Sequence, residues 1–258
     1  MATTSRLKGV DSRVVAVLAA TGLSVAGLGT GILLVVVAAQ VLTAASVTIT
    51  ETLSLVLSLV LVQGVGVLLV AAIYFAVTDR SFGFVGLRTP TLGDFAWVGG
   101  GFLLSVLGYV AVAVVMASTG TQSAQNEVVG IVEGNPDLLL WLVPLSFLLI
   151  GPGEELLFRG IVQGRLREAF GPALAIGVAT FIFVALHYFS LSGSATQRLV
   201  YITALVPPAL VFAVSYERTN NILVPSLIHG AYNALQFGLL YVALKYGPEL
   251  QETAAGLL

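Results

Sequence analysis

Seven long apolar segments constrain the fold of this chain more than any other feature of its sequence. They cover approximately residues 14–42, 53–77, 95–117, 138–166, 172–189, 199–216 and 222–246. About 20 apolar residues in a helix cross the ~30 Å hydrocarbon core of a bilayer. Only 9% of the 258 residues are charged, against about 25% in soluble domains. The sequence therefore predicts an all-α, polytopic transmembrane helical bundle of about seven spans, in contact with the lipid bilayer.

Lysine and arginine gather at alternate ends of these segments. Those on the side of the N-terminus are Arg6, Lys8, Arg13, Arg80, Arg88, Arg165, Arg167 and Arg218. Only Arg198 and Lys245 fall on the opposite side. The positive-inside rule then predicts a multi-pass protein of the cell membrane with a cytoplasmic N-terminus. An eighth span, formed if the long first segment folds back, would break the alternation.

Composition and organisation narrow the function classes. The chain has no cysteine, which excludes disulfides and thiolate chemistry, and its net charge of −2 gives no reason to expect a nucleic-acid partner. The first segment is too long for the apolar region of a cleaved signal peptide. We expect N-terminal membrane helices over 1–130, a core carrying the polar residues over 131–246, and a short tail over 247–258. The connection 118–137 is the only candidate for an extramembrane lid.

Polar groups inside the predicted spans are the candidate functional residues, because ionisable side chains are costly at this depth and usually mark function. The fourth segment carries Glu154, Glu155 and Arg159, the fifth His187, and the seventh His229 and Asn233. Helical rise places these groups in one layer, on the cytoplasmic side of the bilayer centre.

Helical spacing distinguishes these polar residues further. Glu155 and Arg159 are i, i+4 neighbours that can pair, and Glu154 points about 100° away from them. His229 and Asn233 also share a helical face. Phe183, one turn before His187, is expected to wall the same pocket.

These residues form three ordered motifs: Glu154-Glu155-x-x-x-Arg159, Phe183-x-x-x-His187 and His229-x-x-x-Asn233. Together they resemble the EExxxR, FxxxH and HxxxN signatures of the CAAX prenyl protease and bacteriocin-processing family, also called type II CAAX prenyl endopeptidases. The resemblance covers about residues 138–236. It implies an intramembrane endopeptidase with a conical intramembrane cavity, acting on a membrane-associated peptide or protein. A prenylated CAAX-type peptide is one candidate substrate.

The resemblance also implies roles for individual residues. Glu154 and His187 would activate a water, His229 and Asn233 would stabilise the oxyanion, and Glu155 with Arg159 would brace the site. No metal is favoured, because the resemblance implies a water activated by glutamate; the zincin motif HExxH is also absent. A zinc site formed by Glu154, His187 and His229 stays an open alternative. We expect hydrolysis in the cytoplasmic half of the bilayer.

Other functions give different expectations. A proton-coupled transporter would use the buried Glu and His as a relay, and would show broken helices in paired halves of a repeat. Residues 151–153, Gly-Pro-Gly, are a candidate break without a counterpart. A non-catalytic scaffold or immunity protein would keep the fold without the activity. An aspartyl protease is disfavoured because no predicted span contains aspartate, and a serine protease because Gly193-Ser194 lies in a predicted loop.

Overall fold

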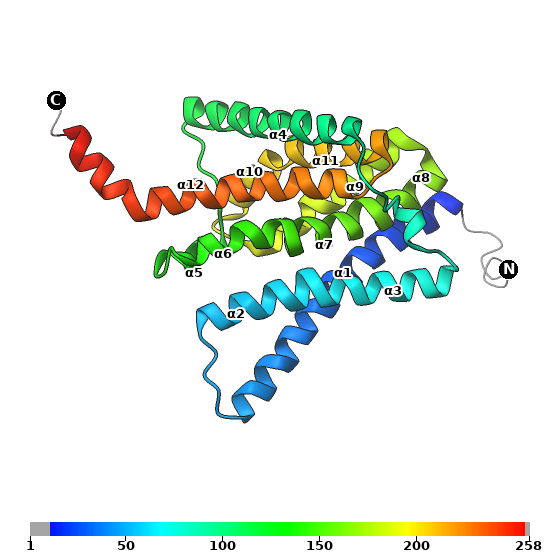
Figure 1. Cartoon of the computed structure of the whole chain (residues 1–258), viewed down its shortest axis with the longest axis horizontal. Helices are drawn as coiled ribbons and strands as arrows, with labels where there is room; N and C mark the ends of the chain where they lie inside the picture. The colour runs from blue at the N-terminus through cyan, green and yellow to red at the C-terminus, as the bar shows by residue number, and fades with distance from the viewer. Residues whose placement is uncertain (1–10, 256–258) are drawn as a thin grey trace.

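A computed structural model of the chain describes residues 11–255, and these residues are almost entirely helical (Figure 1). Seven described helices are long and apolar enough to cross a membrane. They are Ser12–Ala44, Glu51–Thr78, Leu92–Thr119, Leu138–Phe170, Pro172–Ser190, Ala195–Thr219 and Leu223–Gly247. The prediction of a seven-span all-α bundle is thus confirmed. Arg6 and Lys8, which supported the orientation, lie outside the described residues.

Three spans lie within single α-helices, and the other four are assembled from stacked helical pieces. The single helices are α1 (Ser12–Ala44), α4 (Leu92–Thr119) and α12 (Leu223–Ala255). The second span joins α2 (Glu51–Ser58), the π-helical η1 (Leu59–Gly66) and α3 (Val67–Thr78). The fourth joins α6 (Leu138–Leu145), η3 (Ser146–Ile150), α7 (Gly151–Glu155), η4 (Leu156–Gln163) and α8 (Gly164–Phe170). The fifth is α9 (Pro172–His187) with η5 (Tyr188–Ser190), and the sixth is α10 (Ala195–Ala204) with α11 (Val206–Thr219).

Local sequence explains several helix boundaries. Helix α4 starts three residues before the predicted 95, because Thr91 and Asp94 form a capping box there. Asp94 therefore lies in the first turn of the third span, where Arg88 pairs with it. Gly171, with φ of 75°, makes the sharp turn between α8 and α9 that a side chain would hinder. Helix α12 continues past the predicted 246 and ends at Ala255.

The outer surface of the bundle is apolar. Large hydrophobic side chains stand exposed along it, with Leu148 and Phe181 both 70% exposed. A water-soluble protein of this size would cover most such groups, since large exposed apolar patches are rare outside interaction or membrane sites. The exposed belt therefore agrees with contact to lipid.

Close contact between the first two spans depends on small residues. A Cβ atom built on Gly31 of α1 would lie 2.5 Å from the Cα of Val62, and one on Gly66 would lie 2.7 Å from the Gly31 backbone. Two helical backbones approach this closely only where side chains are missing, as is common between membrane helices. The second span is thereby fixed against α1.

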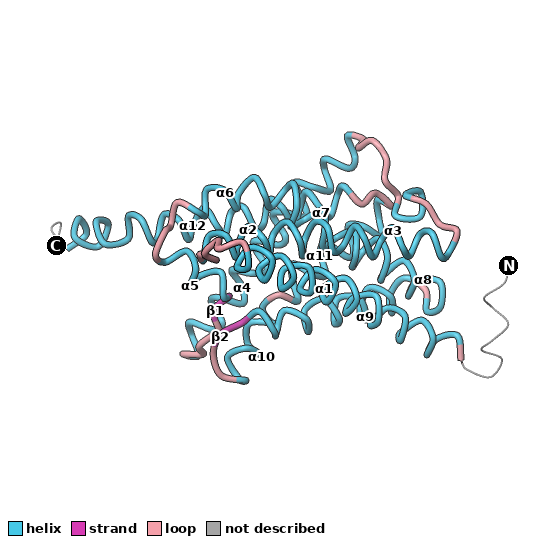
Figure 2. The backbone as a smooth tube through the Cα atoms, turned by 90° about the horizontal axis from the view of Figure 1, so that it is seen from below, coloured by secondary structure: helices cyan, strands magenta, loops and turns pink. Residues whose placement is uncertain are grey.

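The two ends of the bundle differ. At the end where α1 begins, the described residues include Arg13, Arg80, Arg88, Arg165, Arg167 and Arg218; we call this the basic end. The other end carries β1 (Gln125–Asn126), α5 (Glu127–Glu133) and β2 (Leu191–Ser192), and we call it the lid end (Figures 1 and 2). Strands β1 and β2 pair antiparallel, Gln125 with Ser192 and Asn126 with Leu191.

Candidate active site

The fourth span supplies the acidic side chains of the site from α7 and η4. Glu154 is 8% exposed, and Glu155 and Arg159 are fully buried. The span is helical through residues 151–153, so the Gly-Pro-Gly sequence does not break it. The π-helical segments η3 and η4 lie on either side of α7, and such wide turns often occur at functional sites.

The Glu155 carboxylate contacts two buried side chains, the guanidinium of Arg159 and the imidazole of His229. Its Oε2 lies 3.3 Å from Nε of Arg159, and its Oε1 lies 2.8 Å from Nδ1 of His229. The predicted Glu155–Arg159 ion pair is therefore present. Its two atoms are not aligned as a hydrogen bond. The contact with His229 was not predicted.

Arg159 is held from three directions. Its Nη2 donates to the carbonyl oxygen of Ala209 at 3.2 Å, and its guanidinium carbon lies 4.5 Å from the centre of the Phe183 ring. One helical turn farther along, the buried Gln163 donates to the carbonyl oxygen of Ala213. Arg159 and Gln163 thus attach the fourth span to α11, on the side of the acidic residues that faces the basic end.

His229 is fixed on one face of its ring and at one edge. The ring stacks on Phe212 with centroids 4.6 Å apart and planes at 17°, and its Nδ1 contacts Glu155. The remaining nitrogen, Nε2, lies 3.8 Å from Oε2 of Glu154. The side chain therefore presents one nitrogen to Glu154 in a fixed orientation.

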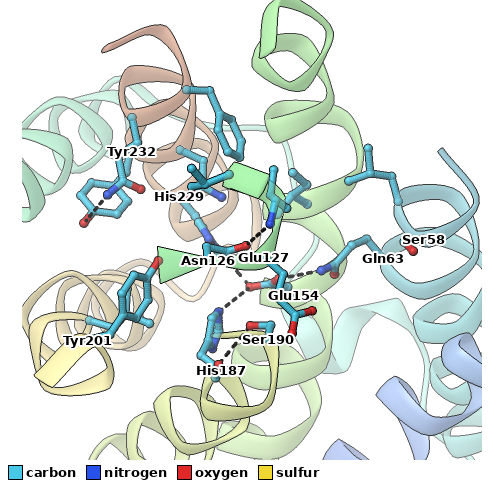
Figure 3. Close-up of a pocket in the computed structure, with 18 of the residues that line it drawn as sticks. Ser58, Gln63, Asn126, Glu127, Glu154, His187, Ser190, Tyr201, His229 and Tyr232 are labelled. Atoms are coloured by element: carbon cyan, nitrogen blue, oxygen red, sulfur yellow. Dashed lines mark hydrogen bonds and ion pairs between the residues drawn. The ribbon is translucent and has the colours of Figure 1, made fainter. Parts of the chain in front are cut away.

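His187 reaches the same carboxylate from the end of α9. Its Nδ1 lies 2.8 Å from the carbonyl oxygen of Phe183, and its Nε2 lies 4.0 Å from Oε2 of Glu154. The Phe183 ring packs 4.6 Å from the imidazole centre and lines the cavity, as its spacing predicted. Figure 3 shows His187 and His229 on opposite sides of Glu154.

Asn233 lines the cavity one turn beyond His229. Among the described residues its side chain makes no hydrogen bond, so its amide is free to contact a bound molecule. The structure thus brings all four predicted catalytic residues, Glu154, His187, His229 and Asn233, to one cavity.

Gln63 is a site residue that the sequence reasoning missed. Its Nε2 donates to Oε1 of Glu154 at 2.8 Å from the π-helical η1. The backbone approach is close, since a Cβ on Gly153 would lie 2.1 Å from the Gln63 carbonyl oxygen. The signal was present in the sequence, because Gln63 is the only amide side chain in the second span. Residues before 130 therefore contribute to the site.

These side chains form the floor of a cavity of about 700 Å³. Its walls include apolar residues of α2, α5 and α12 and the aromatic residues Tyr109, Tyr201 and Tyr232. Asn126 and Glu127, from the segment predicted as a lid, also line it and lie above Glu154 in Figure 3. The lining residues of the lid were not predicted individually.

Ser190 lines the same cavity beside His187, which raises the question of a serine nucleophile. Its Oγ donates to the carbonyl oxygen of His187 at 3.0 Å. A serine activated for catalysis would instead bond to the imidazole of a general base. The serine alternative therefore gains no support from this contact.

One region of the chain matches a known protein family. Residues 136–235 match the family model described as type II CAAX prenyl endopeptidase Rce1-like. This confirms the resemblance drawn from the three motifs. No curated protein matches the chain significantly. No solved structure does so either.

Proposed function

Since residues 136–235 belong to the Rce1-like type II CAAX prenyl endopeptidase family, we propose that the chain is a glutamate-dependent intramembrane endopeptidase. The observation that carries the proposal is the arrangement at Oε2 of Glu154. This oxygen has no hydrogen-bond partner among the described residues, and Nε2 of His229 and of His187 face it at 3.8 and 4.0 Å. A water oxygen placed ~2.8 Å from Oε2 of Glu154 and from Nε2 of either histidine would bridge the gap between them.

The hydrogen bonds of the two imidazoles assign them different roles. A carbonyl oxygen only accepts, so Nδ1 of His187 must donate to Phe183. In a neutral imidazole Nε2 is then the acceptor, and His187 and Glu154 can each accept one hydrogen of the same water. This pair would orient the water, and Glu154 would take its proton.

His229 has the opposite assignment. Its Nδ1 donates to the Glu155 carboxylate, so its Nε2 donates only when the ring is the imidazolium. With that proton, Arg159 and His229 balance Glu154 and Glu155, and the buried group is neutral overall. Nε2 of His229 and the amide of Asn233 would then both donate to the oxyanion, as in oxyanion holes of soluble proteases.

The proposed reaction is hydrolysis of one peptide bond. The water oxygen bonds to the carbonyl carbon as Glu154 accepts the proton, and the carbonyl oxygen becomes the oxyanion. The carbon–nitrogen bond then breaks, and the proton from Glu154 passes to the leaving amine. The products are a carboxylate and an amine, and no oxidant or co-reactant is required.

We propose that this chemistry is metal-free. Ligands on a tetrahedral zinc ion at about 2.0–2.2 Å lie roughly 3.3–3.6 Å from one another. The separations of 3.8 and 4.0 Å from Glu154 to the two histidines are wider than this. In residues 11–255, no cluster of His, Cys, Asp and Glu has the arrangement of a metal site.

No specific observation favours either of the competing functions. A relay transporter was expected to show a broken fourth helix, but α7 is continuous with its neighbours. A scaffold without activity gives no reason for His187, His229 and Gln63 to converge on one carboxylate.

The proposal is tested by trapping the substrate. The wild-type protein and a His187→Ala variant would each be purified from membranes, and the bound and released peptides identified by mass spectrometry. We expect peptides that stay intact on the variant and appear cleaved at one bond with the wild type. Identical peptides and identical termini in both samples would contradict the proposal.

A further inference from the structure

The cavity extends from the Glu154 floor in one direction only. In the second span the lining residues run from Gln63 back to Leu55, toward the lid end, where that span begins. In α12 they run from His229 on to Leu240, again toward the lid end. The lining residues of the fifth span continue to Ser190, its last residue, immediately before β2. The mouth therefore lies beneath β1 and α5.

The opposite side of the floor is closed by packed side chains. Arg159, Gln163 and Ile161 are fully buried between Glu155 and the basic end. Phe158 and Phe183 pack edge to face at 5.0 Å in the same layer. A peptide approaching from the basic end would have to displace this core.

The distribution of lysine and arginine indicates which side of the membrane each end of the bundle faces. Six arginines of the described residues lie at the basic end, and only Arg198 and Lys245 lie at the lid end. The number of lysines and arginines, rather than net charge, sets orientation, and the side with more of them stays in the cytoplasm. The lid end, with the cavity mouth, is thus on the non-cytoplasmic side.

The chemistry of the walls adds a restriction on the substrate. No described lysine or arginine lines the cavity, and its acidic lining residues are Glu154 and Glu127. A free peptide C-terminus would lose hydration there without a cationic partner other than an imidazole. Uncharged, apolar stretches of chain fit the Leu55, Leu59, Phe237 and Leu240 side of the cavity better.

We propose that the substrate is an internal, apolar segment of an exported, membrane-associated peptide or protein, which enters from the non-cytoplasmic face beneath the lid. This rests on the proposed endopeptidase function and specifies its substrate. A prenylated C-terminus on the cytoplasmic surface would face the closed end of the bundle. Access from the lid end leaves the expectation of hydrolysis in the cytoplasmic half unchanged, because that expectation rests on the depth of Glu154 in the fourth span.

The absence of cysteine from the sequence makes the access side measurable. Single cysteines would be introduced by Gln125→Cys on the lid, Ser58→Cys in the cavity wall, and Thr89→Cys at the basic end. Ser105→Cys, at a fully buried position, is the control that should not react. Each full-length variant would be exposed to a charged, membrane-impermeant methanethiosulfonate reagent in right-side-out and inside-out vesicles.

We expect Gln125→Cys and Ser58→Cys to react in right-side-out vesicles, and Thr89→Cys only in inside-out vesicles. Reaction of Ser58→Cys solely in inside-out vesicles would overturn the proposal, because the cavity would then open to the cytoplasm. Failure of Ser58→Cys to react in either preparation, with the variant folded, would also overturn it.

A cleavage assay separates this proposal from the proposed function. The probe is an internally quenched, acylated peptide with an apolar central segment, added to the outside of right-side-out or inside-out vesicles. Cleavage confined to right-side-out vesicles and lost in Glu154→Gln supports both proposals. Glu154-dependent cleavage confined to inside-out vesicles contradicts the access side alone. Cleavage that Glu154→Gln leaves unchanged contradicts the catalytic function, whereas the labelling pattern still decides the access side.

Discussion

His229 and Glu155 are joined by a 2.8 Å contact between Nδ1 and Oε1, and both side chains are buried. This contact crosses from α12 to α7 and fixes which nitrogen of His229 faces Glu154. An acidic partner on one imidazole nitrogen orients the ring and fixes a proton on that nitrogen. In the proposed mechanism, Glu155 would act on the reaction through His229 while also pairing with Arg159.

The Glu155→Gln substitution tests this role. The amide keeps the shape and can accept from Nδ1, but it no longer compensates the charge of a protonated His229. We expect kcat to fall by about 10²-fold, the effect of losing one oxyanion donor, with a much smaller change in KM. Steady-state kinetics on a confirmed substrate checks this. Glu51→Gln, at an exposed position at the start of α2, is the control and should behave as wild type. Equal kcat values for Glu155→Gln and wild type would show that the contact has no catalytic role.

Gln63→Leu should impair catalysis without unfolding the protein. Leucine removes the donor at 2.8 Å from Oε1 of Glu154, a hydrogen bond to a charged group worth about 1.5–3 kcal/mol. We expect kcat/KM to fall about 10- to 100-fold, measured as the rate of peptide product formation. Gln122→Leu removes an exposed amide at the lid end and should leave the rate unchanged. Matching rates for the two variants would remove Gln63 from the site.

Arg159→Met should destabilise the fold. The substitution leaves the Glu155 charge buried without its cationic partner and removes the bond to the Ala209 carbonyl. Breaking one partner of a buried pair costs about 3–5 kcal/mol. Unfolding of the protein in mixed micelles by increasing denaturing detergent measures the difference. Arg165→Met breaks only an exposed pair with Glu168 and should cost less than about 1 kcal/mol. Equal stability of the two variants would contradict a bracing role for Arg159.

Gly153→Ala should disturb the contact between the second and fourth spans. Its Cβ would lie 2.1 Å from the carbonyl oxygen of Gln63, so the backbones must separate. Overpacking of this kind costs about 1–3 kcal/mol, and here it would also move Gln63 from Glu154. We expect lower stability and lower kcat in the same variant. Gly177→Ala, with nothing within 4 Å of its Cβ, is the matched control within a membrane helix. If both variants retain wild-type stability and rate, the close approach is not required.

The spans and the meeting of the polar residues could be predicted because both follow from simple periodicities. Apolar runs of sufficient length identify membrane helices, and helical rise brings Glu154, His187 and His229 to one depth. Burial of these groups then requires partners across the bundle, which the structure supplies.

The detailed contacts could not be predicted from the same rules. The π-helical η1 and η4 alter the direction of side chains relative to a regular 3.6-residue helix, so the contact of Gln63 with Glu154 cannot be derived from spacing. Glu155 was paired with Arg159 by its i, i+4 spacing, but spacing within one helix says nothing about His229 on another. The pairing of β1 with β2 joins two-residue strands, which are too short to leave a pattern in the sequence.

The most direct test of the account is the rate of peptide-bond cleavage by Glu154→Gln. Glutamine keeps the size of the side chain and can keep the bond to Gln63, but it cannot accept the proton of the attacking water. We predict that the purified variant unfolds at the same detergent fraction as wild type and forms product at least about 100-fold more slowly. Product formation at the wild-type rate by this folded variant would contradict the assignment of Glu154 as the catalytic base.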